Sequence, residues 1–406
     1  MTYFRHTELV NRYHVSLKTV HNWIDAAKQG KLDLKLVENG SRTYVANNPG
    51  NVLILEKLAE EGKKYRNVRF NKVVTPKPEF YEVYSRRQIL DIINNLMVHR
   101  EIPLQYSYMD EGAHNWDEWI RHLASEDAPN SINNSLELLK LNAGVFDQLV
   151  FDYERVNVID VGVGNAYPIR DLLAHLQDQG VLHRYVALDI SEEMVDIARK
   201  NVTDWFGDTV NFEGYVRDIC IGRFDDLLVD DMLSAKADKT INIVLLLGGT
   251  LSNFRSASDV VRNIYNSLGV RDVIVQGSKI DAESLRKHFD RHPDERVNEL
   301  PLVPRFAISL LNIDREYYDV EMGYDEDERM RFVRIRFKTA VTLHFKFEDI
   351  KRSINFERGE TLLLGRIRQM TSTEVITEYE DQGFNLLQSS KTKNRDGMLA
   401  IFSVGH

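Results

Sequence analysis

The chain has 406 residues, of which 43% are hydrophobic and 28% charged; this ordinary globular composition excludes a disordered or fibrous protein and predicts two or three domains. Because it has no long apolar run, no apolar leader and a single cysteine, Cys220, we expect a cytoplasmic protein with no membrane association, disulfide or metal site. The net charge of −10 argues against an enzyme that wraps nucleic acid along its length, although residues 1–75 hold 13 Lys and Arg against 7 Asp and Glu.

Residues 5–46 predict a small unit of helix, turn, helix and hairpin. A first short helix precedes Ser16, which is a suitable N-cap for a second helix. The dipeptide Asn39-Gly40 predicts a tight hairpin between two short strands. Apolar residues recur at helical spacing in the second helix and predict a buried stripe of Leu17, Val20, Ile24 and Ala27.

This order resembles the winged helix-turn-helix of MerR-type and excisionase-type proteins, which implies DNA as a partner. The residues expected to contact DNA are the outward basic and polar ones, Lys18, Thr19, His21, Asn22 and Arg42. One lysine on the helix face predicts weak binding by a monomer, so DNA binding implies a homodimer. The alternative interpretation is a docking or dimerisation module. A helix over residues 51–66 and a proline-containing linker complete a first domain of residues 1–75.

Beyond residue 75, strands alternate with helices, which is typical of an α/β unit with a parallel sheet. Residues 290–370 contain alternating runs that suit an added antiparallel layer. We therefore expect a Rossmann-like core over residues 76–289, followed by an added α+β layer and C-terminal strands over residues 290–406. The five core strands are predicted at residues 156–161, 184–189, 210–215, 240–249 and 272–277.

The ends of these strands predict a cofactor site. Gly162 and Gly164 follow the first strand, where the lack of a side chain lets a ligand approach backbone N–H groups. Asp189, 25 residues after Gly164, ends the second strand, where a carboxylate can accept both hydrogen bonds of a ribose diol. Asp218 is predicted to accept from an adenine amino group, and Asn165 to bind the methionine end of S-adenosylmethionine. NAD carries the same ribose, so these residues alone leave both cofactors open.

Two further segments bear on the choice between NAD and S-adenosylmethionine. SYMDEGAHNWDEWI contains Tyr108 and Gly112, and LLLGGTLSNF, after the fourth strand, contains Thr250 and Asn253. With a third segment, LLNIDREYYDVEMGYDEDERMRFVRIRF, they resemble the histidine-specific methyltransferases of ergothioneine biosynthesis. The resemblance implies a class I methyltransferase fold and S-adenosylmethionine as cofactor. It also implies that Tyr108, Gly112 and Thr250 belong to the substrate site and that Asn253 holds the substrate amino group beside the sulfonium.

The chain departs from this family at its substrate-binding positions. Asp127-Ala128-Pro129 stands where the family has Tyr-Tyr-Pro, and Gly365 and Ile367 stand where it places a Glu and a Ser that bind imidazole. Because discrimination depends on such polar groups, histidine is not the expected acceptor. Arg366 and Arg368 alternate with Ile367. If they face the pocket, they are predicted to bind an extra anion on the substrate; the alternative is a solvated strand face.

These features predict an S-adenosylmethionine-dependent methyltransferase that acts on the amino nitrogen of an amino acid or a similar small amine. Methyl transfer from a sulfonium depends mainly on positioning, so Asn253 and Tyr108 are the predicted catalytic residues. Residues 250–254 lack the prolines of base-amino DNA methyltransferases, and Cys220 follows the third strand, unlike the nucleophile of C5-cytosine enzymes. The remaining alternative is a DNA-binding regulator that uses a degenerate methyltransferase domain as a ligand sensor.

Overall fold

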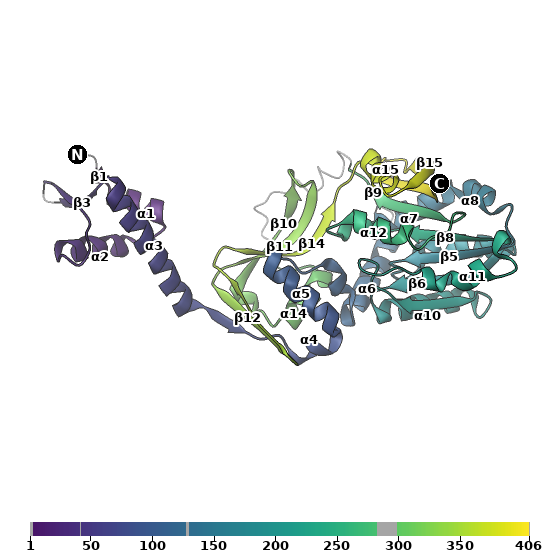
Figure 1. Ribbon diagram of the computed structural model, residues 1–406, viewed down its shortest axis with the longest axis horizontal. Helices are drawn as coiled ribbons and strands as arrows, with labels where there is room; N and C mark the ends of the chain where they lie inside the picture. The colour runs from purple at the N-terminus through teal and green to yellow at the C-terminus, as the bar shows by residue number, and fades with distance from the viewer. Residues whose placement is uncertain (1–2, 41, 127–129, 282–298, 406) are drawn as a thin grey trace. The chain divides into compact units, whose positions relative to one another are not determined.

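Figure 1 shows the computed structural model of the chain, which describes residues 3–40, 42–126, 130–281 and 299–405. The chain divides into two compact units. The first comprises Met1–Val73, Thr339–Thr342 and Asn355–Gly359, and the second comprises Val74–Lys338, Leu343–Ile354 and Glu360–His406. The expected boundary at residue 75 is close to this division. The one expected between residues 289 and 290 lies outside the described residues, and the two domains expected beside it belong to one unit.

The first unit has its elements in the order that the sequence predicts. Two helices, α1 (His6–Tyr13) and α2 (Leu17–Lys28), precede a hairpin of β2 (Leu36–Asn39) and β3 (Arg42–Ala46). A short strand, β1 (Tyr3–Phe4), pairs with β3, and the helix α3 (Pro49–Phe70) follows. Ser16 is the N-cap of α2, as expected, because its hydroxyl accepts a hydrogen bond from the Thr19 N–H at 3.1 Å. DNA binding by this unit stays a prediction.

The buried stripe of α2 differs from the prediction at its first residue. Val20, Trp23 and Ile24 are buried in the core of this unit, whereas Leu17 is 48% exposed. The large indole of Trp23 lies one turn beyond Val20 and beside Ile24, so it sets the direction of the buried face. Leu17 then falls at the margin of that face.

A seven-stranded sheet of order β15-β16-β9-β8-β5-β6-β7 is the centre of the second unit. Its five parallel strands correspond to the five predicted ones: β5 (Arg155–Val161), β6 (Leu182–Asp189), β7 (Phe212–Val216), β8 (Thr240–Leu246) and β9 (Val273–Lys279). The antiparallel strands β15 (Phe384–Lys391) and β16 (Gly397–Val404) complete the sheet beside β9. The C-terminal strands therefore belong to the Rossmann-like core and not to a separate layer.

Helices cover both faces of this sheet because its strands are apolar on both sides. Val158 of β5 belongs to one buried cluster and its neighbour Ile159 to the other. The first cluster includes residues of α7 (Ser131–Leu141), α8 (Ala143–Val150), α9 (Arg170–Asp178) and α10 (Glu192–Phe206). The second includes residues of α12 (Ala257–Tyr265) and α15 (Ser372–Glu380). The short elements between them are η2 (Tyr167–Ile169), η3 (Asp225–Leu227), α11 (Val229–Leu233) and η4 (Ala237–Lys239).

Two small antiparallel sheets confirm the alternating pattern of residues 290–370. One has the order β10-β11-β14 and the other β13-β12-β4. Figure 1 shows β10, β11 and β14 side by side. The strands are β4 (Lys72–Val74), β10 (Tyr318–Asp325), β11 (Met330–Phe337), β12 (Val341–Phe347), β13 (Ile350–Phe356) and β14 (Thr361–Arg368).

The second unit also contains further helical segments. They are α4 (Pro78–Val83), α5 (Arg86–Val98), η1 (Leu104–Tyr108), α6 (Glu111–Ser125), η5 (Thr250–Asn253), α14 (Leu302–Leu310) and η6 (Arg315–Tyr317). Of these, η1, α6 and η5 contribute the residues that matter most for the site described below. Within the part of the chain that the structure describes, no helix is both long and apolar enough to cross a membrane.

Candidate functional site

A cavity of about 1360 Å³ lies at the carboxyl ends of the parallel strands, where α/β sheets bind ligands. The turn after β5, the end of β6 and the loop after β7 line it through residues 160–165, 188–190 and 217–219. Residues of η1, α6, η5, β11 and β14 line it as well. The cavity therefore brings together most of the segments that the sequence selected.

The turn after β5 needs its glycines for two reasons. Gly162 and Gly164 have φ angles of +69° and +54°, which residues with a side chain rarely adopt. In addition, a Cβ atom on Gly164 would lie 2.4 Å from Trp116, and one on Gly162 would lie 3.1 Å from the Thr250 methyl group. The sequence predicted that this space admits a ligand. Trp116 and Thr250 lie against these two glycines, and all four residues line the cavity, so close approach of a ligand to this turn stays a prediction.

Asp189 lies at the end of β6, as predicted, and its carboxylate lines the cavity. The Ser191 N–H donates to Asp189 Oδ1 at 3.1 Å. Burial raises the pKa of Asp189 to about 6, although hydrogen bonds from the backbone of Ser191 and Gly164 oppose the rise. The carboxyl group therefore ionises near neutral pH and retains capacity to accept hydrogen bonds from a ligand.

Among the other carboxyl groups that line the cavity, two lie at or just beyond the carboxyl ends of parallel strands. Asp218 lies after β7, as predicted; the Cys220 N–H donates to its Oδ1 at 3.0 Å, and burial raises its pKa. Asp160 of β5 was not predicted. Burial raises the pKa of Asp160 to about 7, and the Tyr185 hydroxyl donates to its Oδ2 at 3.0 Å. The signal that could have found Asp160 is an acid at the end of a buried strand, two residues before Gly162.

Asn165 lines the cavity, but its side chain serves the turn. Its Nδ2 donates to Asp117 Oδ1 at 2.8 Å, and its Oδ1 accepts from the Tyr167 N–H at 3.1 Å. The side chain is 2% exposed. Asn165 therefore joins the turn to α6, which carries Asp117.

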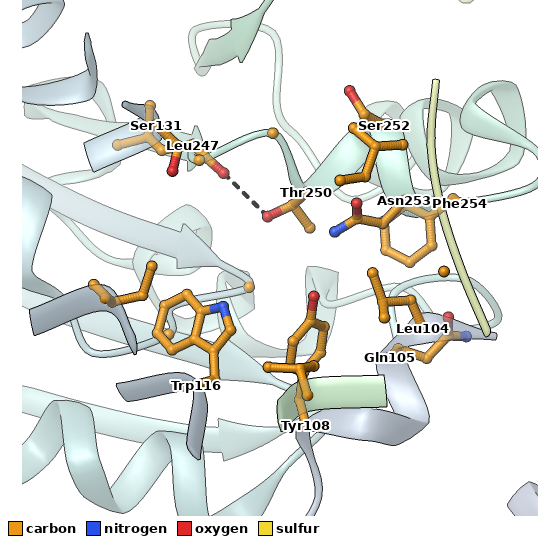
Figure 2. A pocket seen from close by; sticks show the side chains of 18 of the residues that line it. Leu104, Gln105, Tyr108, Trp116, Ser131, Leu247, Thr250, Ser252, Asn253 and Phe254 are labelled. Carbon is orange, nitrogen blue, oxygen red and sulfur yellow. Dashed lines mark hydrogen bonds between the residues drawn. The ribbon is translucent and has the colours of Figure 1, made fainter. Parts of the chain in front are cut away.

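Figure 2 shows the Tyr108 phenol and the Asn253 amide directed into the same part of the cavity, although they come from η1 and η5. Burial and the charge of Asp189 raise the pKa of Tyr108, so its hydroxyl stays protonated and can donate. The Thr250 hydroxyl donates to the Leu247 carbonyl oxygen at 3.0 Å, so Thr250 anchors its own loop. The structure thus brings together Tyr108 and Asn253, the predicted catalytic pair.

Trp116 is one of the aromatic residues at this site that were not predicted from the sequence. Its ring meets that of Tyr108 edge-on, with 6.3 Å between centroids and an interplanar angle of 78°. It stands on α6, four residues after Gly112, inside the segment that carried the family resemblance. Helical spacing alone does not show which face of α6 meets the cavity.

Gly112 was predicted to bind substrate, but it does not line the cavity. It is buried, and a Cβ atom there would lie 2.1 Å from the Ser107 carbonyl oxygen. Gly112 therefore permits α6 to pack closely on η1. Its role is to position Tyr108 rather than to contact a ligand.

The prediction that Arg366 and Arg368 bind substrate is also wrong. Gly365 and Ile367 line the cavity, so the two arginines alternate onto the other face of β14. Arg366 donates to both carboxylate oxygens of Glu101, at 2.8 and 3.0 Å, and Arg368 is exposed. The Arg255 guanidinium pairs with Glu101 as well. Arg368 therefore agrees with the alternative of a solvated strand face, whereas Arg366 is largely buried in an ion pair.

Comparison with known proteins places these features in a family. Residues 86–404 match the family model described as histidine-specific methyltransferase, SAM-dependent, where SAM is S-adenosylmethionine. No curated protein matches the chain.

Solved structures share the general arrangement only distantly. A methyltransferase from Clostridium acetobutylicum is 12% identical, covering 73% of this chain and 98% of its own, with a TM-score of 0.38. Magnesium protoporphyrin IX methyltransferase from Synechocystis is 13% identical, covering 73% and 96%, with a TM-score of 0.38. A sugar N-methyltransferase from Streptoalloteichus is 13% identical, covering 72% and 93%, with a TM-score of 0.34. The fold assignment therefore rests on the strand order given above.

Proposed function

We propose that this chain, which belongs to the family of histidine-specific, S-adenosylmethionine-dependent methyltransferases, methylates the amino nitrogen of an amino acid or similar small amine other than histidine. Its cofactor is S-adenosylmethionine, whose sulfonium supplies the methyl group and the leaving group. The arrangement of Tyr108, Asn253 and β14 around one cavity supports the finer statement about the acceptor.

The donors and acceptors of the cavity suit this cofactor. Asp189 would accept from the two ribose hydroxyls, as a carboxylate at the end of the second parallel strand does. Asp160, a carboxyl group beside the glycine turn, would pair with the methionine ammonium. Asp218 would accept from the adenine amino group. Each of these carboxyl groups lies at the end of a different parallel strand, so together they span the length of one extended ligand.

Tyr108 and Asn253 position the acceptor. The Asn253 carbonyl can accept from an amine N–H, and the Tyr108 hydroxyl can donate to a polar atom beside that amine. An α-amino group has an unperturbed pKa of about 7.7–8.0, so only a modest shift leaves its lone pair free. Holding the reacting atoms in line can supply roughly 7–11 kcal/mol of the barrier. The chain's own contribution to the reaction is therefore orientation and exclusion of water.

The single observation that argues against histidine as the acceptor is which residues of β14 line the cavity. Gly365 and Ile367 line the cavity and offer no side-chain hydrogen bond to an imidazole ring. A site without such groups loses most of its ability to select a polar substrate. The other departure from the family, Asp127-Ala128-Pro129, lies outside the described residues.

Substrate panels with purified protein and labelled S-adenosylmethionine test this proposal. Histidine is expected to be a poor acceptor, and Gly365→Glu combined with Ile367→Ser is expected to raise its relative rate by about tenfold or more. The Glu side chain has room to start, because a Cβ atom on Gly365 would meet Val333 and Leu104 only at 3.7 and 3.8 Å. Efficient trimethylation of histidine by the unmodified protein would falsify the acceptor assignment. Asn253→Ala is the control, with methyl transfer lost and cofactor affinity retained.

A further inference from the structure

Three further polar side chains line the same cavity and come from other strands than the carboxylates already described. Lys279 is the last residue of β9, Arg331 lies on β11, and Gln369 directly follows β14. None of these residues has a role in the proposed cofactor site. All three line the cavity in which the proposed acceptor binds, so their charges and hydrogen-bonding groups indicate what kind of acceptor fits.

The strand register places two of these segments side by side. Arg331 pairs with Ile367, and Val333 pairs with Gly365, in the antiparallel ladder of β11 and β14. Directly opposite residues in such a ladder point to the same face. Arg331 therefore stands on the cavity face, beside the apolar surface that replaces the imidazole-binding residues of the family. Gln369, two residues beyond Ile367, continues that face into the cavity.

Lys279 is a partly buried cation. Its ammonium forms no hydrogen bond or salt bridge with the part of the chain that the structure describes. Burial and the like charge of Arg331 lower the pKa of Lys279, and the charge of Asp396 opposes this. The Asp396 carboxylate also lines the cavity; Asn134 Nδ2 and Thr392 Oγ1 donate to its Oδ1 at 2.9 and 3.1 Å, and it forms no salt bridge with Lys279. A partly buried charge that lacks an ion-pair partner is destabilising, and a bound anion would offset this cost.

Gln369 gives an independent indication of a ligand. Its side chain is 4% exposed, and its Oε1 has no hydrogen-bond partner among the described residues. A buried amide oxygen that lacks a hydrogen-bond partner destabilises the folded protein. The side chain lines the cavity, so a bound molecule is the available source of that partner.

We propose that Lys279 and Arg331 bind an anionic group of the methyl acceptor, a carboxylate or a phosphate, with Gln369 completing the site. Apolar side chains of Leu104, Val333 and Ile367 also line the cavity and suit the part of the acceptor that joins this group to the reacting amine. The acceptor is thus an amino compound with an anion at a distance from its amine. The amine end of this inference rests on the proposed function, whereas anion binding does not.

Binding of a matched series to the full chain saturated with S-adenosylhomocysteine tests the proposal. The carboxylate probes are L-glutamate and L-2-aminoadipate, the phosphate probe is O-phospho-L-serine, and the neutral probes are L-glutamine and L-norleucine. At least one acid is expected to bind about tenfold tighter than its neutral counterpart, which is the scale of one charge-assisted contact. Comparison of the carboxylate and phosphate probes identifies which anion the site prefers.

Variants connect this preference to the named residues. Lys279→Met and Arg331→Met are each expected to reduce the acid preference to about threefold or less, with S-adenosylhomocysteine affinity retained. Lys279→Arg should restore most of it, which separates loss of charge from loss of folding. Lys351→Met removes an exposed lysine of β13 and should change nothing.

Three results would overturn the proposal: equal binding of acids and neutral probes, no binding of any acid, or an undiminished preference in folded Lys279→Met. Methyl incorporation is measured separately on the same compounds. An acid preference in binding without any methyl transfer would contradict the proposed function and leave the anion site intact. Methyl transfer to neutral amines without an acid preference in binding would support the proposed function and contradict the anion site.

Discussion

Trp116 occupies the space that a side chain on Gly164 would need, since a Cβ atom there would lie 2.4 Å from the indole. One residue further along, the Asn165 amide donates to Asp117 of the same helix at 2.8 Å. The glycine turn and α6 are thus joined by one steric contact and one hydrogen bond. The wall of the cavity that α6 forms depends on both.

Gly164→Ala is therefore expected to lower stability and weaken cofactor binding together. The methyl group must displace Trp116 and tolerate a φ of +54°, which should cost about 2–4 kcal/mol in unfolding free energy. Gly180→Ala is the matched control, because Gly180 has a φ of +71° but no atom near the added methyl group. Its cost should be about 1 kcal/mol, with cofactor affinity retained. Thermal unfolding measures stability and calorimetry measures cofactor affinity. Equal losses in the two variants would show that the contact with Trp116 makes no contribution to either quantity.

The affinity for S-adenosylhomocysteine should depend on pH through Asp189. Its pKa is about 6 in the folded protein, and the ionised form accepts hydrogen bonds from the ribose. Affinity is expected to fall as the pH drops through about 6. Asp160, with a pKa of about 7, adds to the fall if it pairs with the ammonium. Calorimetry from pH 5 to 8 checks this, and Asp189→Asn should weaken binding at pH 8 and flatten the part of the curve near pH 6.

The same shift has the opposite consequence for stability without ligand. The pKa of Asp189 is raised above its ordinary value of 3.8, so the folded state holds the proton more tightly than the unfolded state. This contribution is complete below about pH 4 and is lost as the pH rises through about 6. Asp189→Asn is therefore expected to stabilise the unliganded protein at pH 8 relative to its effect at pH 4. An identical effect at both values in denaturant titrations would contradict the raised pKa.

Glu101 is expected to hold three cavity segments together. It precedes η1, pairs with Arg255 just after η5, and accepts from Arg366 on β14. Glu101→Gln leaves two cations without a counter-ion and should cost about 3 kcal/mol. Asp349→Asn, which removes an exposed pair with Arg86, should leave the free energy of unfolding nearly unchanged. Urea titrations compare them, and similar small costs would mean that the Glu101 network contributes little.

For the first unit, DNA binding is tested best without deleting residues. Lys18, His21 and Asn22 are exposed on α2, and Arg42 is exposed on the hairpin, where the predicted contact surface requires them. Lys18→Ala combined with Arg42→Ala should make the log–log salt dependence of binding shallower by about one to two. Lys31→Ala, an exposed lysine after α2, is the control. If intact protein shows no salt-sensitive mobility shift, the docking interpretation replaces DNA binding.

The strands and the acids at their ends could be predicted from the sequence because each depends on local pattern. Asp189 follows a continuous apolar run, and such a run forms a buried strand wherever it is placed in a parallel sheet. Gly162 and Gly164 could also be predicted, because they directly follow such a strand. The packing of Trp116 against Gly164 could not be predicted, because it depends on where α6 lies in the tertiary structure.

In a strand of alternating polar and apolar residues, the sequence alone does not show which face of the strand meets the cavity. In β14, Arg366 and Ile367 lie on opposite faces, and a shift of one residue would exchange them. Pairing with Glu101 and with β11 decides the outcome, and both partners are distant in sequence. Two of the cations that line the cavity, Lys279 and Arg331, lie on other strands, where the local sequence pattern does not indicate a site.

The position of β16 has a consequence for synthesis of the chain. β16 pairs with β9, so β9 has one unpaired edge until residues 397–404 have left the ribosome. An exposed edge of an apolar strand is a site for intermolecular pairing. The nascent second unit, with β5, β6, β7 and β8 already available, must therefore wait for its last strand, and delay at that stage favours aggregation.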